Sequence, residues 1–150
     1  MDYKKILISA VFVMLISLII NTAGLFLNID QYESTSRLWN PQMLSLDILF
    51  YTLLLIFGFI LGLIFTLTYM FISKSIRQNS VLMTGLVYGG MLFVLIGVPI
   101  SLYTYLFFSI PLTLLVSLTI QNLLVFFISG LGIVYIMRYT CKFSNAGGLK

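Results

Sequence analysis

The chain has 150 residues, of which 61% are hydrophobic and 8% are charged, and its formal net charge is +4 with no histidine. About a quarter of the residues of an ordinary soluble domain are charged, so this composition excludes a water-soluble fold. Without histidine, haem ligation and general-base catalysis by that side chain are excluded. The single cysteine, Cys141, excludes an internal disulfide and a Cys-rich metal site.

Four apolar segments are long enough to cross a bilayer, since a span needs about 20 apolar residues. In chain order they are predicted at about 6–27, 46–72, 81–103 and 112–137. An exterior loop is expected at about 28–45 and a flexible tail over 141–150. We therefore expect an all-α integral membrane protein, in which residues 1–150 form one domain and four transmembrane helices form a bundle.

Basic residues are distributed unevenly between the two sets of loops. One set holds Arg37 with most of the acidic residues, whereas the other holds Lys4, Lys5, Lys74, Arg77, Arg138, Lys142 and Lys150. An excess of Lys and Arg marks cytoplasmic loops, so both termini are predicted to be cytoplasmic and the protein to be a multi-pass protein of the cell membrane. Basic residues sorted in this way are expected to contact lipid headgroups, and no nucleic-acid partner is expected.

Two local signals modify the second and third spans. Asn40-Pro41 is typical of a helix start, with Asn as N-cap and Pro in the first turn, which places Asp47 near the positive end of the helix dipole. In the third span, Gly97 and Pro99 interrupt the apolar run, and proline removes a backbone donor within a helix. The sequence therefore predicts a kink at Pro99.

Small residues recur at the spacing that lets transmembrane helices approach closely. In lipid no hydrophobic effect drives helices together, so close packing depends on such residues. The candidate helix-packing positions are Gly58, Gly62, Gly85, Gly89, Gly130 and Gly132. The motif predicts packing either between helices of one chain or between chains, and it does not distinguish the two.

Polar side chains gather in the exterior halves of three spans. Because an unsatisfied polar group in hydrocarbon is costly, these groups are expected to point inward and to meet. They are Ser17, Asn21, Ser101, Thr113, Ser117, Gln121 and Asn122. One interpretation is structural, since interhelical hydrogen bonds average about 0.6 kcal/mol each. The other is a polar pocket, open to the outside, that binds a neutral or amphiphilic ligand.

No ionisable side chain lies deep inside a span. The four carboxylates, at Asp2, Asp30, Glu33 and Asp47, all lie at or beyond the predicted interfaces. Proton-coupled carriers typically keep an ionisable group near the midplane, and a Ser or Thr nucleophile here lacks an evident base. The sequence therefore predicts no catalytic residues, no cofactor and no metal site.

Three functions remain as hypotheses. The first is a non-catalytic accessory or structural subunit of a membrane complex, with the bilayer and other membrane subunits, or further copies of the chain, as partners. The alternative is a small homo-oligomeric transporter or channel for a neutral or lipophilic solute, with a polar outer vestibule. A membrane enzyme is the third hypothesis, and it would depend on interface residues such as Arg37, Glu33, Asp47 and Tyr51.

Overall fold

The computed structural model of the chain describes residues 3–34, 48–76, 80–108 and 110–145. Its helical elements are α1 (Tyr3–Leu27), α2 (Ile29–Ser34), α4 (Ile48–Ile76), α5 (Val81–Leu92), the π-helical turn η2 (Phe93–Gly97), α6 (Val98–Phe107) and α7 (Leu112–Asn145). Four helical segments are long and apolar enough to cross a membrane: Tyr3–Leu27, Tyr51–Ile76, Val81–Phe107 and Leu112–Tyr139. The predicted helical architecture with four membrane-spanning segments is confirmed at this level.

The helices extend beyond several of the predicted boundaries, since α4 ends at Ile76 and α6 at Phe107. Helix α7 continues to Asn145, so residues 141–145 are helical where a flexible tail was predicted. Apolar length sets where a helix leaves hydrocarbon, but its own backbone hydrogen bonds allow it to continue further. The predicted exterior loop contains the short helix α2. The predicted helix start at Asn40-Pro41, together with Asp47, lies outside the described residues.

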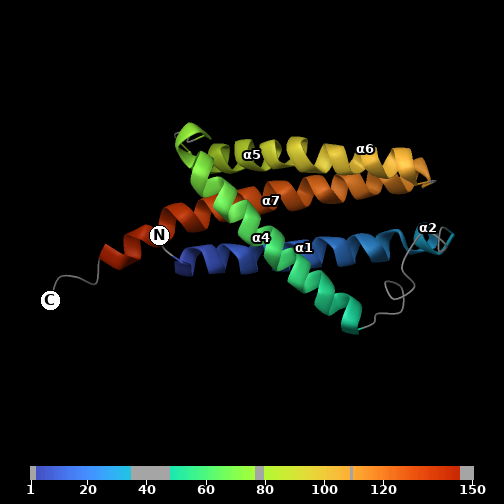
Figure 1. The fold of residues 1–150 in the computed structure, drawn as a ribbon, viewed down its shortest axis with the longest axis horizontal. Helices are drawn as coiled ribbons and strands as arrows, with labels where there is room; N and C mark the ends of the chain where they lie inside the picture. Colours follow the sequence, from blue (N-terminus) through green and yellow to red (C-terminus); the bar gives the residue numbers. More distant parts are fainter. Residues whose placement is uncertain (1–2, 35–47, 77–79, 109, 146–150) are drawn as a thin grey trace.

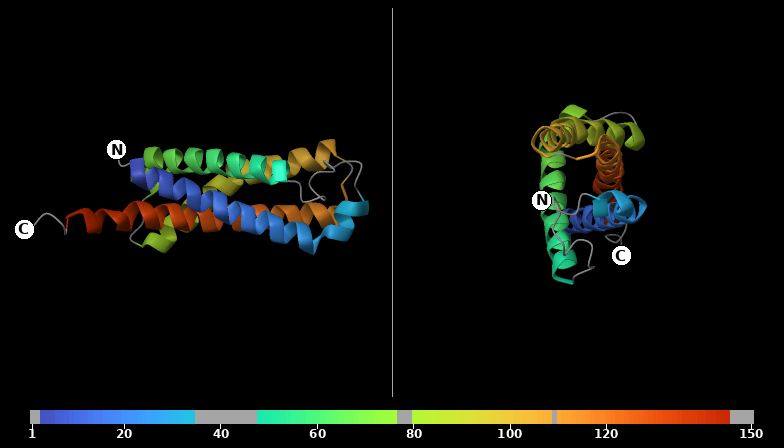
Figure 2. Two further views of the ribbon diagram at one scale, coloured as in Figure 1. Left: turned by 90° about the horizontal axis from the view of Figure 1, so that it is seen from below. Right: turned by 90° about the vertical axis from the view of Figure 1, so that its right-hand side faces the viewer.

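Helices α1, α5–α6 and α7 run along the long axis of the molecule, whereas α4 crosses one side of it obliquely (Figures 1 and 2). Helix α1 packs against both α4 and α7, and α7 also packs against α5. Helices α4 and α5, although consecutive in the described chain, touch at few positions. The first and the last spans therefore form the centre of the bundle, and α4 is held mainly by α1.

The third span stays helical through its glycine and proline. Val98 donates its backbone N–H to the carbonyl of Phe93, five residues earlier, and this contact closes the π-helical turn. Pro99 follows in the first turn of α6, where a missing N–H costs least. The predicted interruption is thus a π-helical turn located just before the proline, and a bend at Pro99 stays a prediction.

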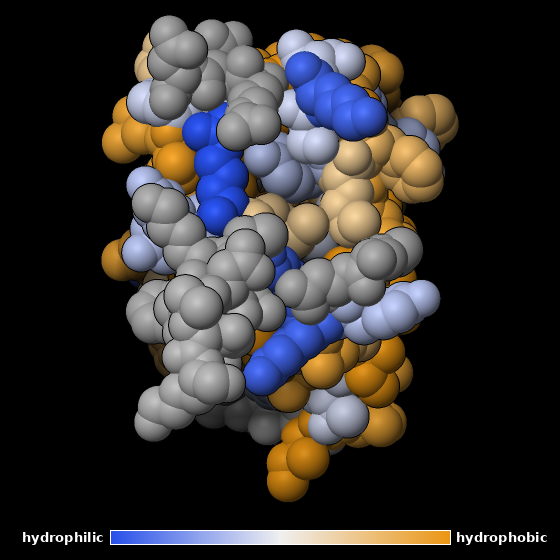
Figure 3. Space-filling view, turned by 90° about the vertical axis from the view of Figure 1, so that its left-hand side faces the viewer, coloured by the Kyte–Doolittle hydropathy of each residue, from blue (hydrophilic) through white to orange (hydrophobic). Residues whose placement is uncertain are grey.

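The described charged residues are sorted to opposite ends of the molecule. Lys4 and Lys5 lie in the first turns of α1, Lys74 lies in the last turn of α4, and Arg138 lies towards the end of α7. These helix ends come together, and hydrophilic side chains gather there (Figure 3). Asp30 lies on α2 at the other end. We call these the basic end and the α2 end.

The core fills the half of the bundle nearer the basic end. Its buried apolar and aromatic residues are Val13, Phe65, Tyr69, Tyr88, Leu92, Phe126, Ile133 and Val134. The Tyr88 hydroxyl donates to the backbone carbonyl of Phe65, and the Tyr69 ring lies 5.2 Å from the Tyr88 ring, centroid to centroid. Packed aromatic rings therefore occupy the interior of this half of the bundle.

Candidate functional site

Two glycines of α4 face α1 where these helices cross, and Gly62 is the one that the close approach requires. A Cβ atom added to Gly62 would lie 2.6 Å from the carbonyl oxygen of Ala10, and one added to Gly58 would lie 3.4 Å from the Cα of Met14. The first distance is shorter than real Cβ contacts allow, so the backbones approach closely only because Gly62 has no side chain. These glycines position one wall of the site described below.

A second close crossing joins α5 to α7. A Cβ atom on Gly89 would lie 2.7 Å from the carbonyl oxygen of Phe126, and one on Gly130 would lie 2.7 Å from the carbonyl oxygen of Gly85. Gly132 lies against the ring of Phe12 instead. In this fold the glycines at all of these positions contact helices of the same chain.

A hollow of about 330 Å³ lies between α1, α4, α7 and the third span, and we call it the central hollow. Three polar side chains line it: Ser17 and Asn21 from α1, and Asn122 from α7. The remaining lining is apolar, with Phe65 and Phe126 among it. Their ring centroids are 5.5 Å apart, so this aromatic pair borders the hollow on the side of the core.

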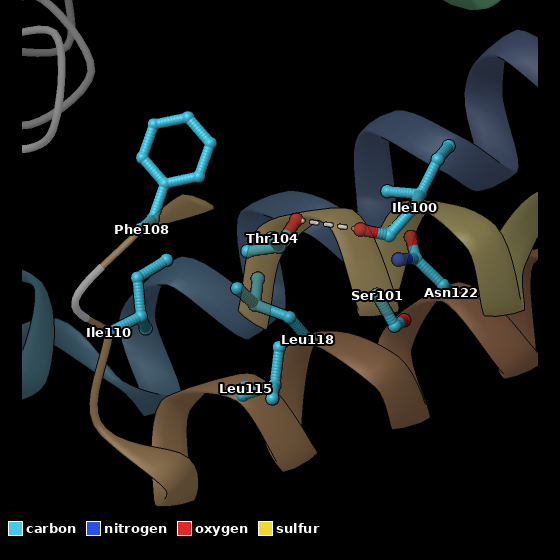
Figure 4. A pocket seen from close by; sticks show the side chains of 8 residues that line it. All are labelled: Ile100, Ser101, Thr104, Phe108, Ile110, Leu115, Leu118 and Asn122. Carbon is cyan, nitrogen blue, oxygen red and sulfur yellow. Dashed lines mark hydrogen bonds between the residues drawn. The ribbon is translucent and has the colours of Figure 1, made fainter. Parts of the chain in front are cut away.

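A second hollow, also of about 330 Å³, lies between α6 and α7 towards the α2 end, and we call it the α6–α7 hollow (Figure 4). Ser101 and Thr104 line it from α6, and Asn122 lines it from α7. Thr104 donates its hydroxyl hydrogen to the Ile100 carbonyl at 2.8 Å. Its hydrogen-bonding capacity is therefore partly used within its own helix.

The two hollows meet at Asn122 and Ile100, which line both of them. Within the described part of the chain, the Asn122 amide has no hydrogen-bond partner, whereas Asn21 donates its amide hydrogen to the Ser17 hydroxyl oxygen at 3.1 Å. Phe57 and Ile100 border the central hollow and are 62% and 50% exposed. The hollow therefore reaches the molecular surface between α4 and α6, on the flank that would face lipid.

The predicted polar cluster divides into two groups. Ser17, Asn21, Ser101 and Asn122 line the two hollows, whereas Thr113, Ser117 and Gln121 line neither. Gln121 is buried against Gly24 of α1 and donates from Nε2 to the Ser117 hydroxyl at 3.2 Å. Thr113 donates to the Gln31 side-chain oxygen on α2 at 3.3 Å. The second group joins α7 to α1 and α2.

Several polar contacts between helices were not predicted from the sequence. Thr119 donates to the Ser101 hydroxyl at 3.1 Å and thereby links α7 to α6. Near the basic end, Arg138 donates to the Thr84 hydroxyl at 2.7 Å. The only signal for the first pair was the shared depth of a threonine and a serine in neighbouring spans, and apolar sequence gives no indication of which residues face each other.

The chemistry offered by the hollows is hydrogen bonding within apolar walls. In the part of the chain that the structure describes, no charged side chain lines either of them. Among the described residues, no three His, Cys, Asp or Glu side chains come close enough together to hold a metal ion. Of the interface residues considered for catalysis, Arg37 and Asp47 lie outside the described residues. The described arrangement is suited to binding an uncharged molecule.

Comparison of the chain with protein-family models, curated proteins and solved structures found no significant match.

Proposed function

We propose that this chain is a non-catalytic multi-pass membrane protein that binds and transports a neutral or lipophilic solute. The observation that carries the proposal is the pair of hollows that meet at Asn122. Ligand sites in proteins typically enclose about 300–1,000 Å³ and combine apolar walls with a few polar groups. The central hollow has this size and composition, and it is located between helices long enough to span a bilayer.

The packing of the two halves supports transport with alternating access. The hollows lie beyond the Phe65–Phe126 pair, and the buried Tyr69–Tyr88 pair lies closer to the basic end. In this arrangement the aromatic rings lie between the hollows and the basic end, so movement of solute to the basic end requires the aromatic layer to open. The flexible point that we propose is the π-helical turn with Pro99, where the sequence predicts a kink in the third span.

The proposed orientation places both termini in the cytoplasm and the hollows in the outer half of the cell membrane. Its support is the charge distribution: Lys4, Lys5, Lys74 and Arg138 lie at one end, and seven of the eight basic residues in the sequence belong to one set of loops. A solute would then be taken up from the outer leaflet or from the exterior.

Transport is tested with purified protein reconstituted into liposomes. The probe is a fluorescent short-chain diacylglycerol analogue, whose movement between leaflets is followed by quenching with a membrane-impermeant reductant. We expect movement faster than in protein-free vesicles. Movement at the protein-free rate, for this probe and for a panel of other uncharged lipophiles, would contradict the proposal.

The variants for this assay fill the central hollow. Ser17→Trp and Leu54→Trp place a bulky ring among its lining residues and are expected to abolish the protein-dependent rate. Val116→Trp is the matched control, because Val116 is 50% exposed on α7, lies outside the π-helical turn and lines neither hollow. If the protein-dependent rate is unchanged in both hollow-filling variants, the solute does not pass through the central hollow.

A second proposal is that the chain is a small accessory subunit of a membrane assembly. The observation that favours it is the isolation of α4, which packs mainly on α1 and exposes Ile48, Leu53 and Ile60 along its length. The glycine faces no longer support this proposal, because in this fold they contact helices of the same chain. Exposed apolar residues on α4 are suited to a neighbouring transmembrane helix as well as to lipid.

Native mass spectrometry of protein extracted gently from its own membrane separates the two proposals. A fixed stoichiometry with other polypeptides is expected for an accessory subunit. A monomer or a homo-oligomer alone would contradict that role and would leave transport as the remaining proposal.

A further inference from the structure

We infer that Asn122 anchors the polar group of an uncharged, hydroxyl-bearing lipophile that enters the central hollow sideways from the bilayer. This inference rests on the proposed function and names its ligand class and subsite. The starting observation is the position of Asn122, which lines both hollows and has no hydrogen-bond partner among the described residues. An unsatisfied amide inside a membrane is costly, so a group that pairs with it is stabilised there.

The hydrogen-bonding groups around the central hollow determine what kind of polar group fits. An asparagine side chain has two N–H donors and a carbonyl acceptor, and Asn122 offers all of them. Asn21 uses one donor on Ser17, and its carbonyl oxygen accepts no hydrogen bond within the described residues. A hydroxyl group can both donate and accept a hydrogen bond. It can therefore accept a hydrogen bond from the Asn122 amide N–H and donate one to an asparagine carbonyl oxygen.

The lack of charge in the described lining excludes ionic ligands. A carboxylate, phosphate or ammonium group in the central hollow would lose its hydration without gaining a counter-ion, because no charged side chain is among the described residues that line it. The penalty for burying an unpaired charge exceeds that for burying a hydroxyl group many times over. We therefore expect the site to prefer a long-chain alcohol to the acid of the same length.

The apolar walls of the central hollow indicate what the ligand carries besides its hydroxyl group, and the opening of the hollow indicates how the ligand enters. Leu54, Leu61 and Val125 line the hollow together with aromatic rings, so they provide a surface for a hydrocarbon body. Phe57 and Ile100 at its edge are at least half exposed on a flank that would face lipid. A lipophile already dissolved in the membrane reaches Asn122 past these two residues without crossing water.

The test uses a long-chain alcohol that carries a diazirine, with the carboxylic acid of equal length as its counterpart. Protein in lipid nanodiscs is irradiated with each probe, and labelled peptides are identified by mass spectrometry. We expect the alcohol to label segments that line the central hollow and the acid to label them far less. Competition by unlabelled alcohol gives the apparent affinity.

Two variants on α7 test whether Asn122 binds the ligand or only stabilises the folded protein. Asn122→Leu is expected to weaken alcohol binding about threefold to tenfold, the equivalent of one lost hydrogen bond. Because no described residue pairs with Asn122, the same variant is expected to unfold at the same or higher denaturant concentration. Thr113→Val is the control: it removes a hydroxyl that lines neither hollow and is expected to leave alcohol binding unchanged. Asn122→Ser is the milder replacement should the leucine variant not be recovered.

The outcomes distinguish the inference from the proposal on which it rests. If Asn122→Leu binds the alcohol as the parent does, or if the acid labels the hollow equally, the assigned subsite and ligand class are overturned while transport stands. If the parent neither labels in the hollow nor moves any uncharged lipophile, the inference and the proposed function fail together.

Discussion

At the scale of single residues, glycine positions in this bundle differ in whether they have room for one added methyl group. Gly62 lies against the backbone of α1, whereas a Cβ atom on Gly90 would lie 3.7 Å from its nearest neighbour, the tip of the Phe127 ring. Both glycines are in helix interiors, where glycine is intrinsically less favourable than alanine. The two positions therefore offer a controlled comparison of packing and propensity.

Gly62→Ala is expected to destabilise the folded protein by about 1–3 kcal/mol, because the added carbon forces α1 and α4 apart. Gly90→Ala is expected to stabilise it by up to about 1 kcal/mol through helix propensity alone. Unfolding by sodium dodecyl sulfate, followed by circular dichroism, measures both. Equal stabilities for the two variants would show that the α1–α4 crossing is looser than described.

Tyr88→Phe removes the hydroxyl that joins the third span to the Phe65 carbonyl of α4. We expect a loss of about 0.5–1.5 kcal/mol, the usual net value of one hydrogen bond, measured by the same detergent titration. Tyr105→Phe is the matched control, since Tyr105 is 58% exposed and makes no hydrogen bond within the described residues. A similar loss of unfolding free energy in both variants would show that the effect does not come from the hydrogen bond to Phe65.

The neighbours Gln121 and Asn122 show how far the polar site could be predicted. Both were expected in one pocket because they share a depth in the membrane. Consecutive helix positions point about 100° apart, so Gln121 lies against Gly24 of α1 while Asn122 lines the hollows. Depth follows from sequence position, but the direction that each residue faces depends on where the other helices lie.

At the scale of elements, the third span combines two helix geometries. Its π-helical turn shifts the residues beyond it around the helix axis relative to a regular α-helix. Ser101 lies just beyond the turn and accepts its hydrogen bond from Thr119 of α7. Which side of α6 faces α7 therefore depends on the π-helical turn that precedes α6.

Pro99→Ala restores a backbone donor, which favours regular α-helical hydrogen bonding through 93–97. We expect α6 to rotate and Ser101 to move away from Thr119. In a Cys141→Ser background, a Ser101→Cys and Thr119→Cys pair is expected to form a disulfide readily when Pro99 is kept and slowly when the Pro99→Ala substitution is added. The pair Gln31→Cys and Thr113→Cys, distant from the proline, is the control. Unchanged cross-linking at the first pair would indicate that the π-helical turn does not depend on Pro99.

The uniformly apolar sequence made the existence of the spans predictable, and the same uniformity hid how they pack. Continuous apolar sequence of sufficient length specifies a membrane-spanning helix. However, lipid and protein neighbours are equally apolar, so a hydrophobic pattern does not mark the face that packs. The glycine positions indicated close crossings, yet no sequence pattern pairs Gly62 with Ala10 or Gly89 with Phe126.

At the scale of the whole molecule, the separation of charge is the property with the clearest consequence. Lys4, Lys5, Lys74 and Arg138 lie at one end, and Asp30 lies at the other. Such asymmetry sets the orientation in which a polytopic protein is inserted. The orientation proposed above therefore predicts chemical accessibility from each side of the membrane.

Single cysteines in a Cys141→Ser background test this orientation. Asp30→Cys is expected to react with a membrane-impermeant maleimide in intact cells, because Asp30 is exposed at the end predicted to be exterior. Lys4→Cys, also at an exposed position, is expected to react only after the membrane is permeabilised. The reverse pattern would invert the proposed topology and place the hollows in the inner half of the membrane.

The central position of the first and last spans has a consequence for how the protein is made. A ribosome releases α1 before α7, and α7 is a helix against which a long side of α1 packs. During synthesis that side of α1, with Ser9 buried in the finished fold, has only lipid or the insertion machinery as its neighbour. Assembly of the four-helix bundle is therefore a late event, completed only after α7 enters the membrane.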